Sequence, residues 1–211
     1  MVRTAILVSG GGSNLQAIIA AKLFDEIKNC EIVAVISSQP NVYALDRARA
    51  AGIDASVVDA STFPTKRTFN TALIQKLKDL DVELVVLAGF MQDLQRPLVK
   101  EWENRIINAH PSLMPAFCSA EHHGLQIHQA VLDHGVKVSG ATVHFVTEEI
   151  GVGPIILQKA VDVLPSDNAK SLQQRIMEQA EWEILPRAID LFCRGKLRVE
   201  GQRVIIDEDL P

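Results

Sequence analysis

Cysteine is scarce in this sequence. Three residues, Cys30, Cys118 and Cys193, are spread over 211 positions. Their odd number and wide spacing are typical of reduced thiols in a cytosol rather than of a disulfide framework. Long apolar runs are lacking too, so no segment is predicted to cross a membrane. Residues 1–3 lead directly into a strand-like segment, which predicts that there is no signal peptide. We therefore expect a cytoplasmic protein.

An excess of positive charge is also missing. Lysine and arginine total 21 against 26 aspartates and glutamates, which gives a net charge of −5 at pH 7. A nucleic-acid surface is therefore not expected. With 47% hydrophobic and 22% charged residues, the composition suits one substantial core. Because no repeat, low-complexity tract or linker interrupts the chain, we expect a single domain over residues 1–211.

Apolar runs alternate with helical patterns in the first half of the chain. Strands are predicted at 4–8, 31–36, 55–58 and 83–90, and helices at 15–21, 43–51 and 65–80. Continuously apolar strands separated by helices are typical of a parallel sheet covered on both faces. The second half predicts a helix at 124–134, strands at 138–147 and 155–163, a long helix at 169–194 and a hairpin at 196–206. We predict an α/β fold with a doubly wound, mostly parallel sheet, a long C-terminal helix and a terminal hairpin.

The most informative stretch is residues 108–115, NAHPSLMP, which follows the apolar residues 106–107. On an extended backbone, Asn108 and His110 point to the same side, and Pro111 biases His110 away from helix. An amide donor beside a titratable imidazole suits acyl or formyl transfer, in which a proton moves and an oxyanion is stabilised. The alternative is a surface histidine beside a turn.

A glycine-rich turn, residues 9–14 (SGGGSN), follows the first predicted strand. Glycines allow close approach of an anion, and the next helix, with Ser13 or Asn14 as its expected N-cap, presents free N–H groups. Leu15 stands where a dinucleotide fingerprint has its third glycine. The turn therefore fits a mononucleotide phosphate better than NAD, although a tight turn without a ligand remains the alternative.

Other polar residues have less specific explanations. Four of them are expected in a solvated loop: Glu121, His122, His123 and His128. No metal site is predicted there, because cysteine or carboxylate partners at zinc spacing are lacking. His144 alternates with apolar neighbours, so it is either a hydrogen-bonded core residue or a partner of the catalytic pair. Glu178 and Glu181 share a helix face, for which solvent exposure is the default. Cys118 is expected to be a small filler residue in an active-site loop.

Four ordered motifs, SGGGSNLQ (9–16), LAGFM (87–91), NAHPSL (108–113) and GPIILQ (153–158), span nearly the whole chain. In this respect the sequence resembles the phosphoribosylglycinamide formyltransferases of purine biosynthesis. The resemblance implies a Rossmann-like fold and formyl transfer from the co-substrate 10-formyltetrahydrofolate to the amine of glycinamide ribonucleotide. It implies no metal, nucleic acid or membrane partner, and leaves open whether the protein is a monomer or a homodimer.

The resemblance also assigns residues to the two substrates. Those placed against the ribonucleotide are Gly11, Gly12, Ser13, Asn14 and Glu181. Those placed against the folate are Lys66, Met91, Gln92, Asp93, Leu94 and Asn108. Asn108 and His110 match the catalytic pair. Lys66 stands where the family often has an arginine, and an ammonium would hold a carboxylate less rigidly; Trp182 stands where several members have histidine. The N-terminal half would thus bind the phosphate, and the C-terminal half the folate and the reacting groups.

One catalytic position departs from the family pattern. An alignment without gaps from His144 to Pro154 places Gly151 where the family has an aspartate that pairs with the histidine. Removal of the acidic group from another triad slows the reaction by about 10⁴. Glu148 or Glu149 would be the nearest substitutes, and recovery in Gly151→Asp would identify the missing group. Another explanation of Gly151 is a substitution made to trap a complex. The alternative function is a catalytically impaired folate- or nucleotide-binding homologue.

Two other enzyme classes share the Asn-x-His-Pro-Ser-Leu core. Methionyl-tRNA formyltransferases are expected to have an additional C-terminal barrel and a basic surface. Formyltetrahydrofolate deformylases are expected to have an additional N-terminal regulatory domain. The length of 211 residues disfavours both, and the acidic composition also disfavours the methionyl-tRNA formyltransferases.

Overall fold

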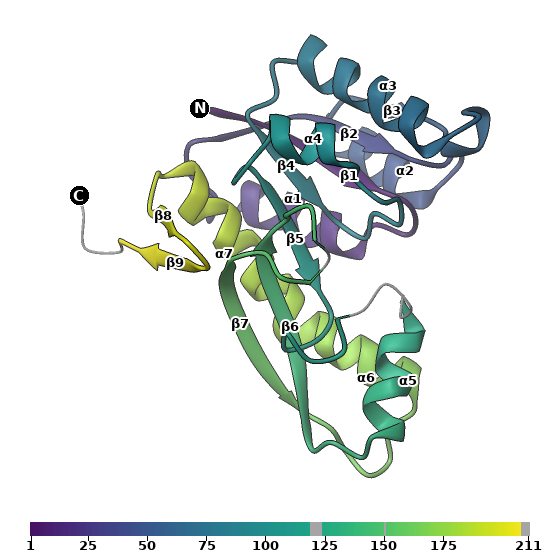
Figure 1. The fold of residues 1–211 in the computed structure, drawn as a ribbon, viewed down its shortest axis with the longest axis vertical. Helices are drawn as coiled ribbons and strands as arrows, with labels where there is room; N and C mark the ends of the chain where they lie inside the picture. Colours follow the sequence, from purple (N-terminus) through teal and green to yellow (C-terminus); the bar gives the residue numbers. More distant parts are fainter. Residues whose placement is uncertain (119–123, 150, 208–211) are drawn as a thin grey trace.

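The computed structural model describes residues 1–118, 124–149 and 151–207. A nine-stranded sheet runs through it in the order β3-β2-β1-β4-β5-β6-β7-β9-β8 (Figure 1). Its strands are β1 (Val2–Val8), β2 (Cys30–Ser37), β3 (Ala55–Val57), β4 (Leu84–Leu87), β5 (Ile106–His110), β6 (Val138–Phe145), β7 (Ile155–Asp162), β8 (Leu197–Glu200) and β9 (Arg203–Ile206). The helices are α1 (Ser13–Leu23), α2 (Tyr43–Ala50), α3 (Lys66–Asp79), α4 (Arg96–Glu101), α5 (Leu125–Asp133), α6 (Ala169–Ile176) and α7 (Trp182–Cys193), with short helical turns at Ala60–Thr62 and Met177–Glu181. The predicted α/β class and the C-terminal hairpin are confirmed.

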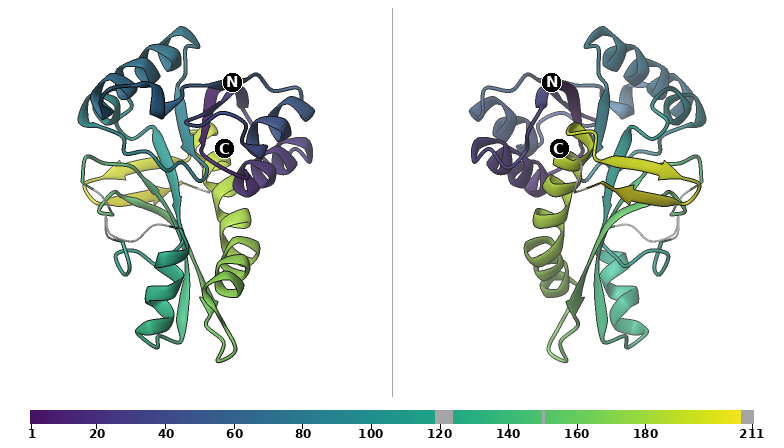
Figure 2. Two further views of the ribbon diagram at one scale, coloured as in Figure 1. Left: turned by 90° about the vertical axis from the view of Figure 1, so that its right-hand side faces the viewer. Right: turned by 90° about the vertical axis from the view of Figure 1, so that its left-hand side faces the viewer.

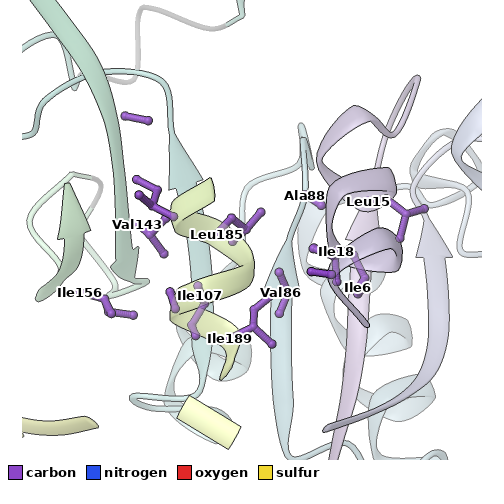
Figure 3. Close-up of a cluster of buried hydrophobic side chains, with 14 of the residues drawn as sticks. Ile6, Leu15, Ile18, Val86, Ala88, Ile107, Val143, Ile156, Leu185 and Ile189 are labelled. Carbon is purple, nitrogen blue, oxygen red and sulfur yellow. The ribbon is translucent and has the colours of Figure 1, made fainter. Parts of the chain in front are cut away.

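The parallel half of the sheet is buried on both faces, which explains its continuously apolar strands. In β1, Ala5 and Leu7 pack in a cluster with residues of α3 and α4. The intervening Ile6 and Val8 pack in a second cluster with residues of α1 and α7. Figure 3 shows part of this second cluster, and Figure 2 shows the helices on the two sides of the sheet.

The order of the parallel strands creates a crevice. β2 and β3 lie on one side of β1, whereas β4 and β5 lie on its other side, and all these pairs are parallel. In open α/β sheets, ligands bind at such a reversal, outside the carboxyl ends of the strands. β6 and β7 then continue the sheet in antiparallel pairs. Their register places His144 of β6 opposite Asn108 of β5.

Two helix predictions need correction. The residue preceding α1 is Gly12, in a left-handed conformation (φ 73°) without a side-chain cap, so the expected capping by Ser13 or Asn14 is wrong. The stretch predicted as one helix at 169–194 contains a π-helical turn, Met177–Glu181, between α6 and α7. Such turns insert a residue into the helical repeat and are frequent at functional sites. Among the described helices, none is long and apolar enough to cross a membrane.

Candidate active site

A pocket of about 650 Å³ lies at the carboxyl ends of β1, β4 and β5. The glycine turn after β1, the segment after β4 and the end of β5 all contribute to its lining. Residues of α5, α6 and the π-helical turn complete it. The expected ribonucleotide-binding, folate-binding and catalytic residues in its lining are Gly11, Gly12, Ser13, Asn14, Met91, Gln92, Asp93, Leu94, Asn108, His110, Gly151 and Glu181. The structure thus brings together all the predicted site residues except Lys66.

The glycine turn is held close to α2. A Cβ atom added to Gly12 would lie 2.7 Å from Cβ of Ala44, and the left-handed φ also favours glycine. Arg47 of α2 donates from Nε to the carbonyl oxygen of Gly11 (3.0 Å) and from a terminal nitrogen to Gln16 (2.8 Å). Together with the backbone N–H groups at the start of α1, the guanidinium makes this end of the pocket favourable for an anion.

Glu181 is buried, contrary to the expected solvent exposure. Its carboxylate accepts a hydrogen bond of 2.6 Å from Nδ2 of Asn14, and it is 6% exposed. Burial raises the pKa of Glu181, and the Asn14 hydrogen bond partly opposes that rise. Glu178, three residues earlier, is exposed as predicted. The π-helical turn separates the two environments because it interrupts the regular helical spacing that the prediction assumed.

Asn108 is held by His144. The two residues face each other in the β5–β6 pair, and Nδ2 of Asn108 lies 3.2 Å from Nε2 of His144. The other ring nitrogen of His144 lies 2.9 Å from the carbonyl oxygen of Phe145, so it carries the proton and Nε2 accepts from Asn108. Burial lowers the pKa of His144 to about 4, which keeps the ring neutral. His144 is therefore both a buried, hydrogen-bonded residue and the hydrogen-bond partner of Asn108, whose catalytic role stays a prediction.

His110 lies beside Asn108 in the pocket lining. Its Nε2 is 3.4 Å from the carbonyl oxygen of Phe117, in the loop that follows β5. Both residues of the pair are half-buried, so they are accessible to a ligand and still positioned by the sheet. An amide with a fixed orientation and an imidazole on the same strand can hold an oxyanion and move a proton.

The segment after β4 is fixed at both ends. The backbone N–H of Met91 donates to Oγ of Ser9 (2.9 Å). Asn70 of α3 donates to the carbonyl oxygen of Asp93 (3.1 Å) and accepts from the N–H of Gln95 (2.9 Å). Lys66 lies outside the lining but forms an ion pair of 2.6 Å with Asp93. The expected contact of Lys66 with a folate stays a prediction.

Gly151 lies in the pocket wall in a left-handed conformation (φ 75°). A Cβ atom built on it would lie 2.4 Å from Sγ of Cys118. Of the two candidate substitutes, Glu148 pairs with Arg96 at 3.0 Å, and Glu149 is an exposed residue of the pocket wall. A side chain at position 151 therefore requires Cys118 to move, a constraint that the sequence comparison did not reveal.

The Formyl transferase family model matches residues 2–189. This chain belongs to that family. It superimposes on the crystal structure of glycinamide ribonucleotide transformylase 1 from Symbiobacterium toebii with a TM-score of 0.91 and 44% identity, covering 98% of this chain and 94% of that one. It is 37% identical over 202 residues to the phosphoribosylglycinamide formyltransferase of Escherichia coli (strain K12), covering 96% of this chain and 92% of that protein. It is 43% identical over 198 residues to the trifunctional purine biosynthetic protein adenosine-3 of Drosophila pseudoobscura pseudoobscura; the match spans 93% of this chain but 14% of that protein.

His128 and Arg47 are among the pocket residues that sequence reasoning missed. His128 was expected in a solvated loop but lies on α5, fully buried, in the pocket lining. The sequence did indicate burial of His128, because Ile127 and the apolar residues 130–132 flank it on a predicted helix. Arg47 lies on α2, and the sequence of this helix does not indicate that any of its residues lines a pocket. Three other residues of the expected loop, Glu121, His122 and His123, lie outside the described residues.

Proposed function

We propose that this formyl transferase moves the formyl group of 10-formyltetrahydrofolate to the amine of glycinamide ribonucleotide. The observation that carries the proposal is one pocket whose lining contains Asn108 and His110 together with the glycine turn and the segment 91–94. Direct transfer requires both substrates in one pocket, with the attacking amine next to the formyl carbon. Relatives named for this reaction match along almost the whole chain.

The mechanism is a direct transfer with no covalent enzyme intermediate. The substrate amine attacks the formyl carbon, and the carbonyl oxygen becomes an oxyanion that accepts a hydrogen bond from Asn108. His110 protonates the folate nitrogen as its bond to the formyl carbon breaks, and the amine loses the proton that balances the reaction. Placing both substrates in one pocket supplies much of the acceleration through orientation.

Each binding end has its own residues. Gly11, Gly12 and Ser13 present backbone N–H groups to the phosphate, with Asn14 and Glu181 beyond them toward the glycinamide. Met91, Gln92, Asp93 and Leu94 line the folate end, and Lys66 reaches that end through Asp93. No observation favours a catalytically impaired binding protein over an enzyme.

The test is spectrophotometric detection of tetrahydrofolate release from 10-formyltetrahydrofolate. We expect release when glycinamide ribonucleotide is added and none when it is omitted. Release without the ribonucleotide would instead indicate hydrolysis. His110→Ala should abolish the signal, and a rate within a few-fold of the parent would contradict the proposed proton carrier. Retained binding of both ligands without any release would indicate the binding protein.

A further inference from the structure

His128 is a buried imidazole to which the mechanism above assigns no task. The side chain is 0% exposed and lines the same pocket as His110. Neither ring nitrogen has a hydrogen-bond partner in the part of the chain that the structure describes. Buried polar atoms without partners destabilise a fold, so each one in a native protein calls for an explanation, of which a function is one.

The imidazole of His128 is neutral. Burial first, and then the positive charge of His110, lowers the pKa of His128 to about 4. A neutral imidazole has one N–H donor and one nitrogen acceptor. It is therefore suited to hold a polar, uncharged group and unsuited to carry a proton at pH 7.

The position of α5 indicates which end of the pocket His128 serves. α5 packs against α6 (Figure 1), and Gln173 of α6 lines the pocket together with Met177 and Glu181 of the π-helical turn. Asn14, which bonds Glu181, also has a buried oxygen without a partner among the described residues. Two sets of unsatisfied polar atoms thus line the wall that continues from the glycine turn. The folate end, by contrast, follows β4.

We propose that His128 binds the acceptor substrate through hydrogen bonds to its glycinamide group. An uncharged amide has a carbonyl acceptor and N–H donors, which match the donor and acceptor of the imidazole. The contact lies beside His110, where the substrate amine must be placed for attack. This inference rests on the proposed function for the identity of the substrate.

The experiment compares three variants by calorimetric binding of glycinamide ribonucleotide, by steady-state kinetics and by melting temperature. His128→Leu keeps a similar volume and removes both nitrogens, whereas His128→Gln keeps one donor and one acceptor. Val131→Ala is the matched control, since Val131 is a fully buried residue of the same helix outside the pocket lining.

We expect His128→Leu to bind glycinamide ribonucleotide about tenfold more weakly, as the loss of buried hydrogen bonds implies, with an unchanged KM for the folate. Its melting temperature should equal or exceed that of the parent, because two unsatisfied buried atoms are removed. His128→Gln should recover part of the affinity. Val131→Ala should lower the melting temperature and leave both affinities unchanged.

Two results would overturn the inference: unchanged ribonucleotide affinity in His128→Leu, or affinity and melting temperature falling together in that variant. If the parent protein binds the ribonucleotide without formylating it, the proposed function is contradicted but the inference on His128 is not. The comparison of ribonucleotide binding between the parent and His128→Leu still decides the role of His128. Parent protein that does not bind the ribonucleotide would contradict both.

Discussion

Asn14 and Glu181 are 167 positions apart in the sequence and joined by a hydrogen bond of 2.6 Å. Asn14 lies in the first turn of α1, directly after the glycine turn, and Glu181 ends the π-helical turn before α7. The bond therefore connects the glycine-turn end of the pocket to the C-terminal helices. It also places a buried carboxylate beside the expected position of the substrate amine.

Glu181→Gln should stabilise the fold and weaken the enzyme. Burial raises the pKa of Glu181 above its ordinary value of 4.5, so folding favours the protonated form. The parent consequently loses stability as the pH rises from about 4.5 through the folded-state pKa, whereas glutamine does not titrate. Urea unfolding at pH 4.5 and pH 8 should show a larger advantage of the variant at pH 8, together with a higher KM for glycinamide ribonucleotide. An advantage that shrinks as the pH rises would contradict the assignment.

Gly12→Ala should impair ribonucleotide binding and stability together. A left-handed φ is unfavourable for alanine by about 1–2 kcal/mol, and the added methyl group would also contact Ala44 at 2.7 Å. Gly52→Ala is the matched control, since Gly52 has a similar φ (71°) with no atom within 4 Å of the added Cβ. Chemical denaturation should show a greater loss for Gly12→Ala, and kinetics a raised KM for glycinamide ribonucleotide in that variant alone. Equal losses would mean that the contact with Ala44 has no effect.

The sequence was sufficient to predict the order of the helices and strands, because each of them can be predicted from the hydrophobic pattern of its own residues. Strands buried on both faces, such as Leu84–Leu87, are continuously apolar, and helices such as Lys66–Asp79 have a polar face and a capping threonine. Asn108 and His110 were predictable for the same reason, since two residues on one strand share a side.

The remaining site features depend on contacts between distant segments. Burial of Glu181 follows from a π-helical turn and from Asn14, neither of which changes the helical pattern of residues 169–194. The pairing of His144 with Asn108 depends on the register between β5 and β6. The close contact between Gly151 and Cys118 depends on how two loops meet. Composition and periodicity contain none of these relationships.

His144→Leu should slow formyl transfer through Asn108 rather than through substrate binding. The leucine cannot accept the hydrogen bond from Nδ2 of Asn108, so the amide loses its fixed orientation toward the oxyanion. We expect kcat to fall about tenfold with little change in KM, and Asn108→Ala to lower kcat by about 10²–10³. A double-mutant cycle on kcat should be strongly non-additive. His144→Gln, which retains an acceptor, should recover part of the rate; additive effects would show that the two residues act independently.

Gly151→Asp should fail to enhance formyl transfer unless Cys118 is replaced as well. The aspartate would have to adopt a φ of 75°, and its Cβ would meet Sγ of Cys118 at 2.4 Å. We therefore expect the single variant to lose activity and melting temperature. Cys118→Gly removes both side-chain atoms that the new Cβ would contact, so the double variant should regain stability relative to Gly151→Asp. If a carboxylate at this position assists His110, kcat of the double variant should also exceed that of Cys118→Gly, and its pH–rate profile should move to higher pH because a nearby anion raises the pKa of an imidazole. An active Gly151→Asp single variant with an unchanged melting temperature would show that Cys118 moves aside without loss.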